Sequence, residues 1–525
     1  MASEPFLLHA GWVVPAHDRP PISQGAVVVS GNRVEAVGPH LELKGRYAGA
    51  KEIGGDQFLL IPGLINGHGH GKGLTDFQRG SLDNTLESWI LGARKFLPLP
   101  VYEDVALCAA KLLKSGVTAT MHNHNLQNPA DYRQEFKDAI RAYADAGIRV
   151  QFNPGIRNQN PFIYGDNEKF LESLSEDTRR VLTAPPHPGS LIAENFIDAV
   201  SDLHARHNSA MCRVGFGPMS PQWCTKDLLL EIKRAAQRLG CPIHTHALQS
   251  IFQKIYGLQA HGKTLVAYLE EIGFLGEEVV IGHCVWPTEK DIAILSRTKT
   301  GVTHHPTCNL RVRNGIAPVF HMLQEGVRVG LGIDSKTIND DEDFIQEMKV
   351  CFLLHRPSSL ELDSPHLTAR EVFRMGTETN AGLLGYGRDL GRLEPGCLAD
   401  LVLLDYERMT FPFTDPVHDP LEVLLYRGKG SHVHTVIVDG KIVVENGRVL
   451  TVAEEDLGKK LREAASRPRA EREKALNRAV DELREQAVKY YRGWTQRVSI
   501  QPYAFFNSRE DGWSQDGLPK GDGIG

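Results

Sequence analysis

The stretch FLLIPGLINGHGH, residues 58–70, gives the strongest indication of the fold. An apolar strand runs into His68 and His70, and glycines flank both histidines. Residues two apart on a strand face the same side of it, so both imidazoles can share one metal ion. A lone histidine is more often an ordinary core or surface residue, but this spacing favours a ligand pair.

Three further strand-like runs end in residues that can bind a metal. CPIHTHALQ, residues 241–249, carries His244 and His246, VVIGHC ends near His283, and VGLGID ends at Asp334. Taken alone, Asp334 fits a turn or a helix cap better than a ligand. Its place in series with the histidine-bearing strands reverses that preference. Neutral imidazoles with one carboxylate suit zinc or a neighbouring transition metal and leave a position for water.

Between these runs the chain repeats one unit, an amphipathic helix, a glycine and a strand. VALCAAKLLKSGVTATMHNH (105–124) and KDLLLEIKRAAQRLGCPIHTHA (226–247) are two copies, with helix stops at Gly116 and Gly240. Such repeats predict parallel strands joined by crossover helices, and this many in series fit a (β/α)8 barrel. Side chains that do chemistry on such barrels lie at the carboxyl ends of the strands, where these histidines stand.

Strand-rich segments bracket the barrel at both ends of the chain. AVVVSGNRVEAVG (26–38) predicts a hairpin, and so do ADLVLLD (399–405) and HTVIVDGKIVVENGRVL (434–450) with their Asp-Gly and Asn-Gly turns. We expect one β-sandwich assembled from residues 1–57 and 395–454, around a barrel of residues 58–394. Residues 455–525 predict a charged helical extension with an aromatic tail.

Composition narrows the class of protein. The 525 residues carry a formal net charge of -6, which gives no electrostatic argument for nucleic acid or an anionic membrane. No apolar run approaches the roughly 20 residues of a membrane helix, and the N-terminus does not read as a signal peptide. The eight cysteines are scattered without a CxxC pair, which indicates reduced thiols and a cytoplasmic location.

The motifs together resemble the amidohydrolase superfamily, in the branch of triazine hydrolases, guanine-type deaminases and phenylurea hydrolases. The resemblance covers roughly residues 8 to 455, through PGLINGHGH, GVTAT, GCPIHTHA, LGEEVVIGHC, HHPTCNLRVRNGIAPV, VGLGIDS and RDLGRLEPGCLADLVLLD. It implies an α/β fold, a metal-dependent (β/α)8 TIM-like barrel with a composite β-sandwich. It also implies a divalent ion held by His68, His70, His246 and Asp334, with His244 as a supporting neighbour.

The resemblance further implies the chemistry. The ion would lower the pKa of water, Asp334 would take its proton, and His283 would stabilise the developing negative charge or orient the nucleophile. His304 matches the seventh-strand histidine of the family and is a third candidate for catalysis.

Two positions depart from the family pattern. The usual His-x-x-Glu of the fifth strand is here His246-Ala-Leu-Gln249, and a glutamine amide cannot carry the proton that the glutamate delivers. Met219 stands where many relatives have histidine. Extra imidazoles offer other groups that titrate near neutrality, although local hydrogen bonding explains each one equally well. With Gln249, the candidates for substrate binding are His122, His124 and His305.

These observations predict a hydrolase that cleaves a C–N bond in a small aromatic or heterocyclic amide, urea or amine. Hydrolytic loss of chloride on the same site is an alternative that would tolerate Gln249, and a non-catalytic binding subunit is another. No HExxH, GxSxG, GxxxxGKS or PCxxC motif offers a rival site. We expect one divalent ion per chain, zinc before iron, manganese or cobalt, because no strand offers a bridging lysine or second carboxylate.

The C-terminal segment carries more aromatic surface than a solvated tail requires. We therefore expect it to pack on the barrel or on a second copy in a homo-oligomer. The aromatic residues concerned are Tyr490, Tyr491, Trp494, Tyr503, Phe505 and Phe506.

Overall fold

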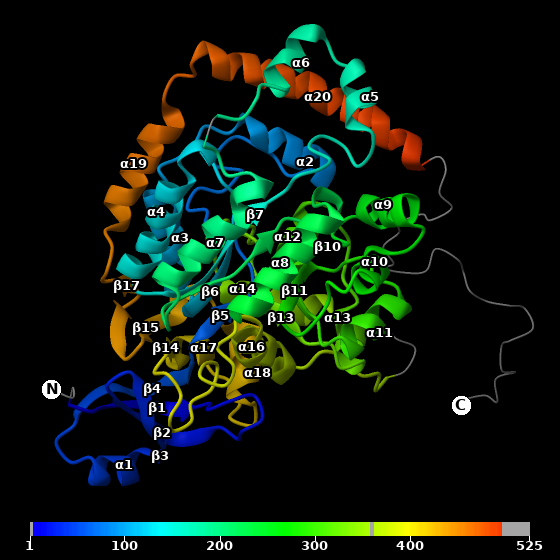
Figure 1. The fold of residues 1–525 in the computed structure, drawn as a ribbon. Helices are drawn as coiled ribbons and strands as arrows, with labels where there is room; N and C mark the ends of the chain where they lie inside the picture. Colours follow the sequence, from blue (N-terminus) through cyan, green and yellow to red (C-terminus); the bar gives the residue numbers. More distant parts are fainter. Residues whose placement is uncertain (1–3, 188, 357–361, 496–525) are drawn as a thin grey trace, which may run out of the picture.

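A parallel barrel forms the centre of the computed structural model, which describes residues 4–187, 189–356 and 362–495 (Figure 1). Its first half has the order β5-β6-β7-β8 and its second half the order β10-β11-β12-β13. A parallel bridge between Phe216 and Ile243 joins the halves on one side. On the other side, the Gly67 amide donates to the Leu331 carbonyl at 2.9 Å, so the ring is closed. The predicted barrel is confirmed.

The barrel strands are short and buried. They are β5 (Leu64–Asn66), β6 (Val117–His124), β7 (Arg149–Ile156), β8 (Cys212–Val214), β10 (Ile243–Ala247), β11 (Val279–His283), β12 (Gly301–His304) and β13 (Val329–Leu331), with β9 (Gly217–Pro218) paired to β7. Every residue of β6 and β7 is buried, because helices cover the outside and side chains fill the inside.

The crossover helices begin and end where the sequence predicts. In α8 (Lys226–Leu239), Thr225 Oγ1 caps the Leu228 amide, and Gly240 ends the helix with φ of +62°. The buried face of α8 carries Leu228, Leu229 and Ile232. The other outer helices include α3 (Val101–Lys114), α4 (Tyr132–Ala146), α7 (Ala193–His207), α10 (Leu265–Glu271), α11 (Glu289–Arg297), α13 (Val319–Gln324), α14 (Phe344–Leu354) and α15 (Ala369–Arg374).

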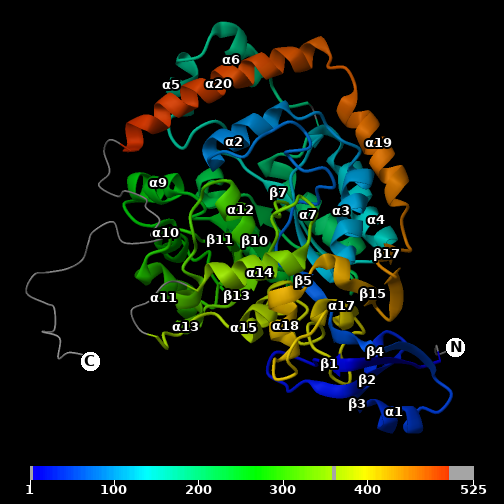
Figure 2. The ribbon, with the colours of Figure 1, turned by 180° about the vertical axis from the view of Figure 1, so that it is seen from behind.

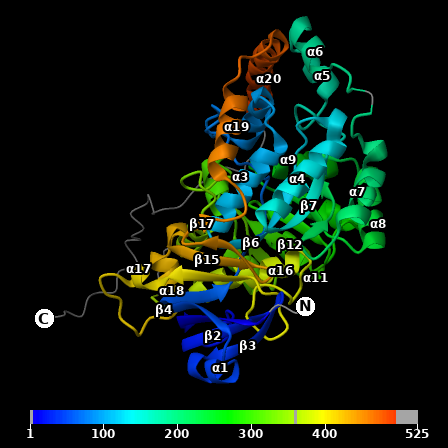
Figure 3. The ribbon, with the colours of Figure 1, turned by 90° about the vertical axis from the view of Figure 1, so that its left-hand side faces the viewer.

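Both ends of the chain build one further sheet, which lies beside the barrel at the bottom of Figure 3. Its order is β17-β16-β15-β14-β4-β1-β2-β3, so strands from the two ends meet where β14 pairs with β4. The strands are β1 (Phe6–Val13), β2 (Ile22–Ser30), β3 (Arg33–Pro39), β4 (Lys51–Pro62), β14 (Leu401–Asp405), β15 (Val433–Val438), β16 (Lys441–Glu445) and β17 (Arg448–Val449).

A buried ion pair ties this sheet to the barrel. The Arg149 side chain on β7 is fully buried, and its Nη2 lies 3.0 Å from Asp400 Oδ1 and 2.8 Å from Asp439 Oδ1. Charge-assisted bonds of this kind satisfy an otherwise costly buried guanidinium. The two carboxylates belong to the segment that forms the sheet, more than 200 residues further along the chain. This contact therefore holds the sheet against the barrel.

The C-terminal extension forms two helices that wrap the barrel. Figure 2 shows α19 (Glu454–Ser466) running along one side and α20 (Glu471–Thr495) crossing the end near α2 (Leu86–Gly92) and α6 (Glu176–Leu182). Tyr491 and Trp494 are buried, and the Tyr164 amide donates to the Tyr491 hydroxyl at 3.0 Å. The extension therefore packs on the barrel, while Tyr503, Phe505 and Phe506 lie outside the described residues.

We expect Leu483→Ala to lower the free energy of unfolding by about 2–5 kcal/mol, the usual cost of truncating a fully buried leucine. Leu483 lies on α20, is 0% exposed and belongs to the main core, whereas Val488 on the same helix is 44% exposed. Urea denaturation of the full chain measures the effect. Val488→Ala is the matched control and should change stability by less than about 0.5 kcal/mol. Equal effects of the two substitutions would show that Leu483 on α20 is not part of the hydrophobic core.

No helix in the described ranges is both long and apolar enough to span a bilayer. All eight cysteines are buried free thiols, as the scattered spacing predicts.

Candidate metal centre

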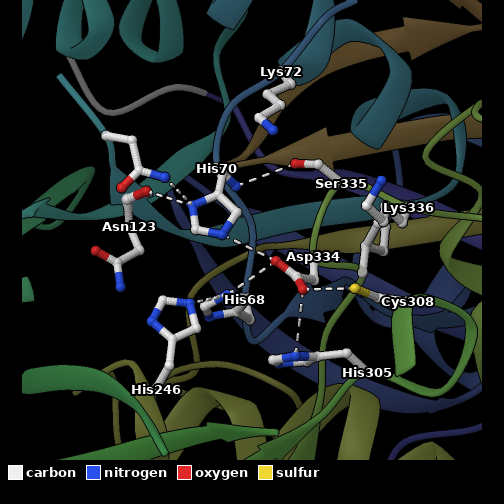
Figure 4. Close-up of polar contacts among 12 residues, drawn as sticks. His68, His70, Lys72, Asn123, His246, His305, Cys308, Asp334, Ser335 and Lys336 are labelled. Carbon is white, nitrogen blue, oxygen red and sulfur yellow. Dashed lines mark hydrogen bonds and ion pairs between the residues drawn. The ribbon is translucent and has the colours of Figure 1, made fainter. Parts of the chain in front are cut away.

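Three barrel strands bring four residues at or just after their carboxyl ends to one point. His68 and His70 follow β5, His246 lies in β10, and Asp334 follows β13. Figure 4 shows these side chains converging at the mouth of the barrel. Asp334 has φ of +54°, a left-handed conformation that disfavours residues with a Cβ. Such strain persists where surrounding structure over-determines it, and it is typical of functional sites.

The candidate ligand atoms lie at distances that suit a shared ion. Asp334 Oδ1 is 3.0 Å from His70 Nε2 and 3.3 Å from His68 Nε2. His246 Nε2 is 3.2 Å from His68 Nε2. Metal–nitrogen bonds of about 2.0–2.1 Å place neighbouring ligands of a tetrahedral ion roughly 3.3 Å apart. The observed separations match this geometry.

Hydrogen bonds on the far side of each ring hold these imidazoles in place. His70 Nδ1–H donates to the Asn123 carbonyl and His246 Nδ1–H to the Met219 carbonyl, both at 2.8 Å. His68 Nδ1 lies 2.8 Å from His244 Nε2. A carbonyl can only accept, so His70 and His246 carry their proton on Nδ1, and Nε2 presents a lone pair to the cluster. Support of this kind is usual around metal-binding histidines.

The protonation states also suit a metal. Burial lowers the pKa of His68 to about 4, although the neighbouring Asp334 opposes this shift. Burial likewise places the pKa of His246 well below its usual range. Burial alone would raise the pKa of Asp334, but the His68 and His70 rings that face it hold that pKa well below its ordinary value. Near neutral pH His68 and His246 are therefore neutral and the carboxylate is ionised, which are the forms that bind metals.

His244→Ala should weaken divalent-metal affinity by about 10–100-fold, the usual loss when a supporting partner of a ligand is removed. The His244 ring is buried and, within the described residues, makes the one hydrogen bond of His68 Nδ1, so its loss leaves the His68 ring free to turn. Metal titration with a chromophoric chelator measures the affinity. His244→Gln, which keeps an acceptor, should recover part of the loss, and unchanged affinity in both variants would contradict this role.

Two further groups contact Asp334 from the other side. His283 Nε2 lies 3.5 Å from Asp334 Oδ2, and its Nδ1 lies 2.9 Å from Asn309 Oδ1. The Cys308 thiol donates to Asp334 Oδ2 at 2.8 Å. His283 thus stands beside the carboxylate with one ring nitrogen facing it, as the sequence predicts for a residue that handles a proton or a developing charge.

His304 ends β12 and His305 directly follows it, and the two side chains point in opposite directions. His305 Nδ1 lies 4.0 Å from Asp334 Oδ2, and its ring stacks on His68 with centroids 4.3 Å apart. It is fully buried beneath the cluster and does not line the cavity described below. His304 faces away, with Nε2 3.0 Å from His355 Nε2. The structure brings His305 to the metal cluster and does not bring His304 there.

A cavity of about 390 Å³ opens above the cluster, within the size range of small-molecule sites. Gln249 lines it, and its side-chain amide bonds to no other residue in the described ranges. His122 and His124 also line it, where Tyr143 and Glu135 hold them at 3.1 and 2.9 Å. Other lining residues include His70, Lys72, Trp89, Arg94, Met219, Trp223, His246, His283, Cys308, Asp334 and Lys336.

Several residues that line the cavity could not be predicted from the sequence. Cys308 lies within the quoted HHPTCNLRVRNG stretch, but a thiol next to a carboxylate has no spacing signal. Lys336 Nζ lies 4.7 Å from the centre of the Trp89 ring and 2.8 Å from Asp83 Oδ1. It comes two residues after Asp334, where only the fold shows that it turns towards the cavity.

Comparison with known proteins agrees with this geometry. The sequence pattern of the amidohydrolase family matches residues 59–443. A 5'-deoxyadenosine deaminase of Methanopyrus kandleri is 31% identical over 411 residues, which cover 77% of this chain and 85% of that protein. A 5-methylthioadenosine/S-adenosylhomocysteine deaminase of Pelotomaculum thermopropionicum is 30% identical over 438 residues, which cover 82% of this chain and 91% of that protein.

Solved structures share the fold at lower identity. An adenosine deaminase of Xanthomonas campestris with bound zinc superposes with a TM-score of 0.73 and 22% identity, covering 87% of this chain and 97% of its own. An atrazine chlorohydrolase of Arthrobacter aurescens TC1 complexed with zinc gives a TM-score of 0.74 and 22% identity, covering 88% of this chain and 100% of its own.

Proposed function

The chain belongs to the amidohydrolase family, and from this premise we propose that it is a metal-dependent hydrolase that removes an amino group from a nitrogen heterocycle. The observation that carries the proposal is the convergence of three imidazoles and Asp334 at the floor of a cavity of about 390 Å³. The aminopurine nucleosides are the substrate class to test first, because the two curated relatives above are named as deaminases of such compounds.

The proposed ligands are His68, His70, His246 and Asp334. Zinc fits this set of three nitrogens and one oxygen, and the structures of two relatives contain zinc. A divalent ion at this site would act as a Lewis acid and lower the pKa of water towards neutrality, which supplies the nucleophile for hydrolysis.

The remaining steps belong to side chains of this chain. Asp334 Oδ2 faces His283 Nε2 at 3.5 Å, so the pair can pass a proton between the attacking water and the departing group. Gln249, with a free amide on the cavity wall, would hold the heterocycle by neutral hydrogen bonds. His122 and His124, which line the same cavity, would also contact the substrate. His305 would support the cluster from below, and His304 has no part in this scheme.

A second candidate function rests on Gln249. An amine needs a proton to leave, whereas chloride leaves without one, so a site lacking the usual glutamate also suits hydrolytic dehalogenation of a heterocycle. One of the solved structures with the same fold is named as an atrazine chlorohydrolase, so we include dehalogenation among the reactions to test.

A matched pair of substrates separates the two candidates. Adenosine and 6-chloropurine riboside differ only in the leaving group and give the same purine product. The zinc-loaded protein should be screened with this pair, with 5'-deoxyadenosine and 5'-methylthioadenosine, and with amino- and chloro-triazines. Ammonia release supports the first proposal, and chloride release without ammonia supports the second. Zinc-loaded protein that releases neither from any compound would contradict both.

A further inference from the structure

A second group of metal-binding side chains lies on the opposite side of β12 from the catalytic cluster. His304 ends β12, Cys351 lies in α14, and His355 directly follows α14. One ligand atom from each lies within 4.8 Å of the other two. His304 and Cys351 are completely buried, and His355 is 6% exposed. We propose that these three residues form a second, structural site for a zinc-like divalent ion.

The local fold explains how the three side chains meet. Cys351 and His355 are four residues apart, so they lie on one face of the α14 helix, and the His355 amide continues the last turn by donating to the Cys351 carbonyl at 3.3 Å. His304 approaches that face because the side chains of His304, at the end of β12, and His305, directly after it, point to opposite sides. The same alternation sends His305 to the catalytic cluster, so the two sites are distinct.

The distances resemble those of the catalytic cluster. His304 Nε2 and His355 Nε2 are 3.0 Å apart, against 3.0 to 3.3 Å between the candidate catalytic ligands. Two imidazoles and a thiolate form a ligand set that zinc and related soft or borderline ions prefer. The thiol proton of Cys351 would pass to solvent on binding, and a water molecule would complete the coordination.

Without an ion, these side chains are poorly satisfied for their depth. Within the described residues, the only hydrogen bond among the three side chains is the contact between the two ring Nε2 atoms. Cys351 makes no hydrogen bond within the described residues. Buried polar groups that lack partners cost about 1–3 kcal/mol each, so a trio held in this arrangement points to a ligand.

An ion here would join barrel strand β12 to α14, the helix that follows the last barrel strand. It would therefore act on stability and not on the chemistry. The sequence predicts one ion per chain, at the catalytic site. With this second site, the proposed total is two ions per chain.

Cobalt titration of the full-length, metal-free protein tests the proposal, because a thiolate ligand gives cobalt a characteristic near-ultraviolet charge-transfer band. Wild-type protein should bind two cobalt ions per chain and show the band. Cys351→Ser should lose the band and one ion. Cys308→Ser is the matched control, because its thiol contacts Asp334 at the catalytic cluster, and it should keep the band. His70→Ala should lose the other ion and also keep the band.

The contrary results are equally clear. One cobalt ion without a thiolate band in wild-type protein would overturn the proposal, and so would a band that survives Cys351→Ser but disappears in Cys308→Ser. If Cys351→Ser does not fold, His355→Gln, at the helix end, gives the same decision. It should weaken cobalt binding at the thiolate site at least about tenfold, and unchanged binding would again overturn the proposal.

Discussion

His70→Ala should remove the catalytic ion and lower kcat/KM by at least about 10³-fold. A bound ion contributes several kcal/mol to the transition state of hydrolysis, and each 1.4 kcal/mol or so corresponds to a factor of ten. His70 is the suitable position because its Nε2 contacts Asp334 at 3.0 Å while its other nitrogen is held by a backbone carbonyl. Truncating it therefore takes away one ligand, while His68 remains 3.3 Å from Asp334.

Metal content by mass spectrometry and steady-state kinetics on the same preparation measure the two losses. The control is His321→Ala on the exposed face of α13, which should keep both metal and activity. His70→Ala protein that is folded, lacks the ion and still turns over substrate at the wild-type rate would show that the reaction does not use this site.

Gln249→Glu should lower kcat/KM on the natural substrate by about 10–100-fold. Gln249 lines the cavity with an unoccupied amide, so glutamate would place a charge where neutral hydrogen bonds are expected. Losing such a bond while burying its partner costs about 1–3 kcal/mol, which corresponds to this range. Glutamate can deliver a proton, so a weak release of ammonia is expected from amino-heterocycles that the wild-type protein does not deaminate.

Gln249→Met provides the control without a charge and should also lose substrate affinity, with no new activity. The pH profiles of the three proteins show whether the glutamate titrates during turnover. A Gln249→Glu enzyme that is markedly faster on the natural substrate, with the wild-type pH profile, would mean that the glutamine is a tolerated loss and not an adaptation.

The chemistry-bearing strand ends could be predicted because they combine three local signals: an apolar run, flanking glycines and residues spaced two apart. His68 and His70 show all three, and the structure brings them together with His246 and Asp334. The barrel also follows from its repeated helix–glycine–strand unit. The family resemblance implied which of these residues act as metal ligands, and residue spacing alone does not show this.

What the sequence could not show depends on contacts between distant segments. In HHPTCN, strand register decides to which side each histidine points. The sequence alone therefore predicts a catalytic role for His304, whereas the structure turns it towards His355. The thiol of Cys308 contacts Asp334 only because a helix turn follows that strand. The packing of α20 against α2 and α6 joins residues about 300 or more positions apart.

Anomalous diffraction at the zinc edge from zinc-loaded crystals tests the central claim most directly. His68 belongs to two sets of close ligand atoms, one with His70 and His246 and one with His283, His305 and Asp334. We predict a strong peak within bonding distance of His68, His70, His246 and Asp334, and His283 should lie outside bonding distance of it. A peak centred between His283, His305 and Asp334, or no peak at this end of the barrel, would contradict it.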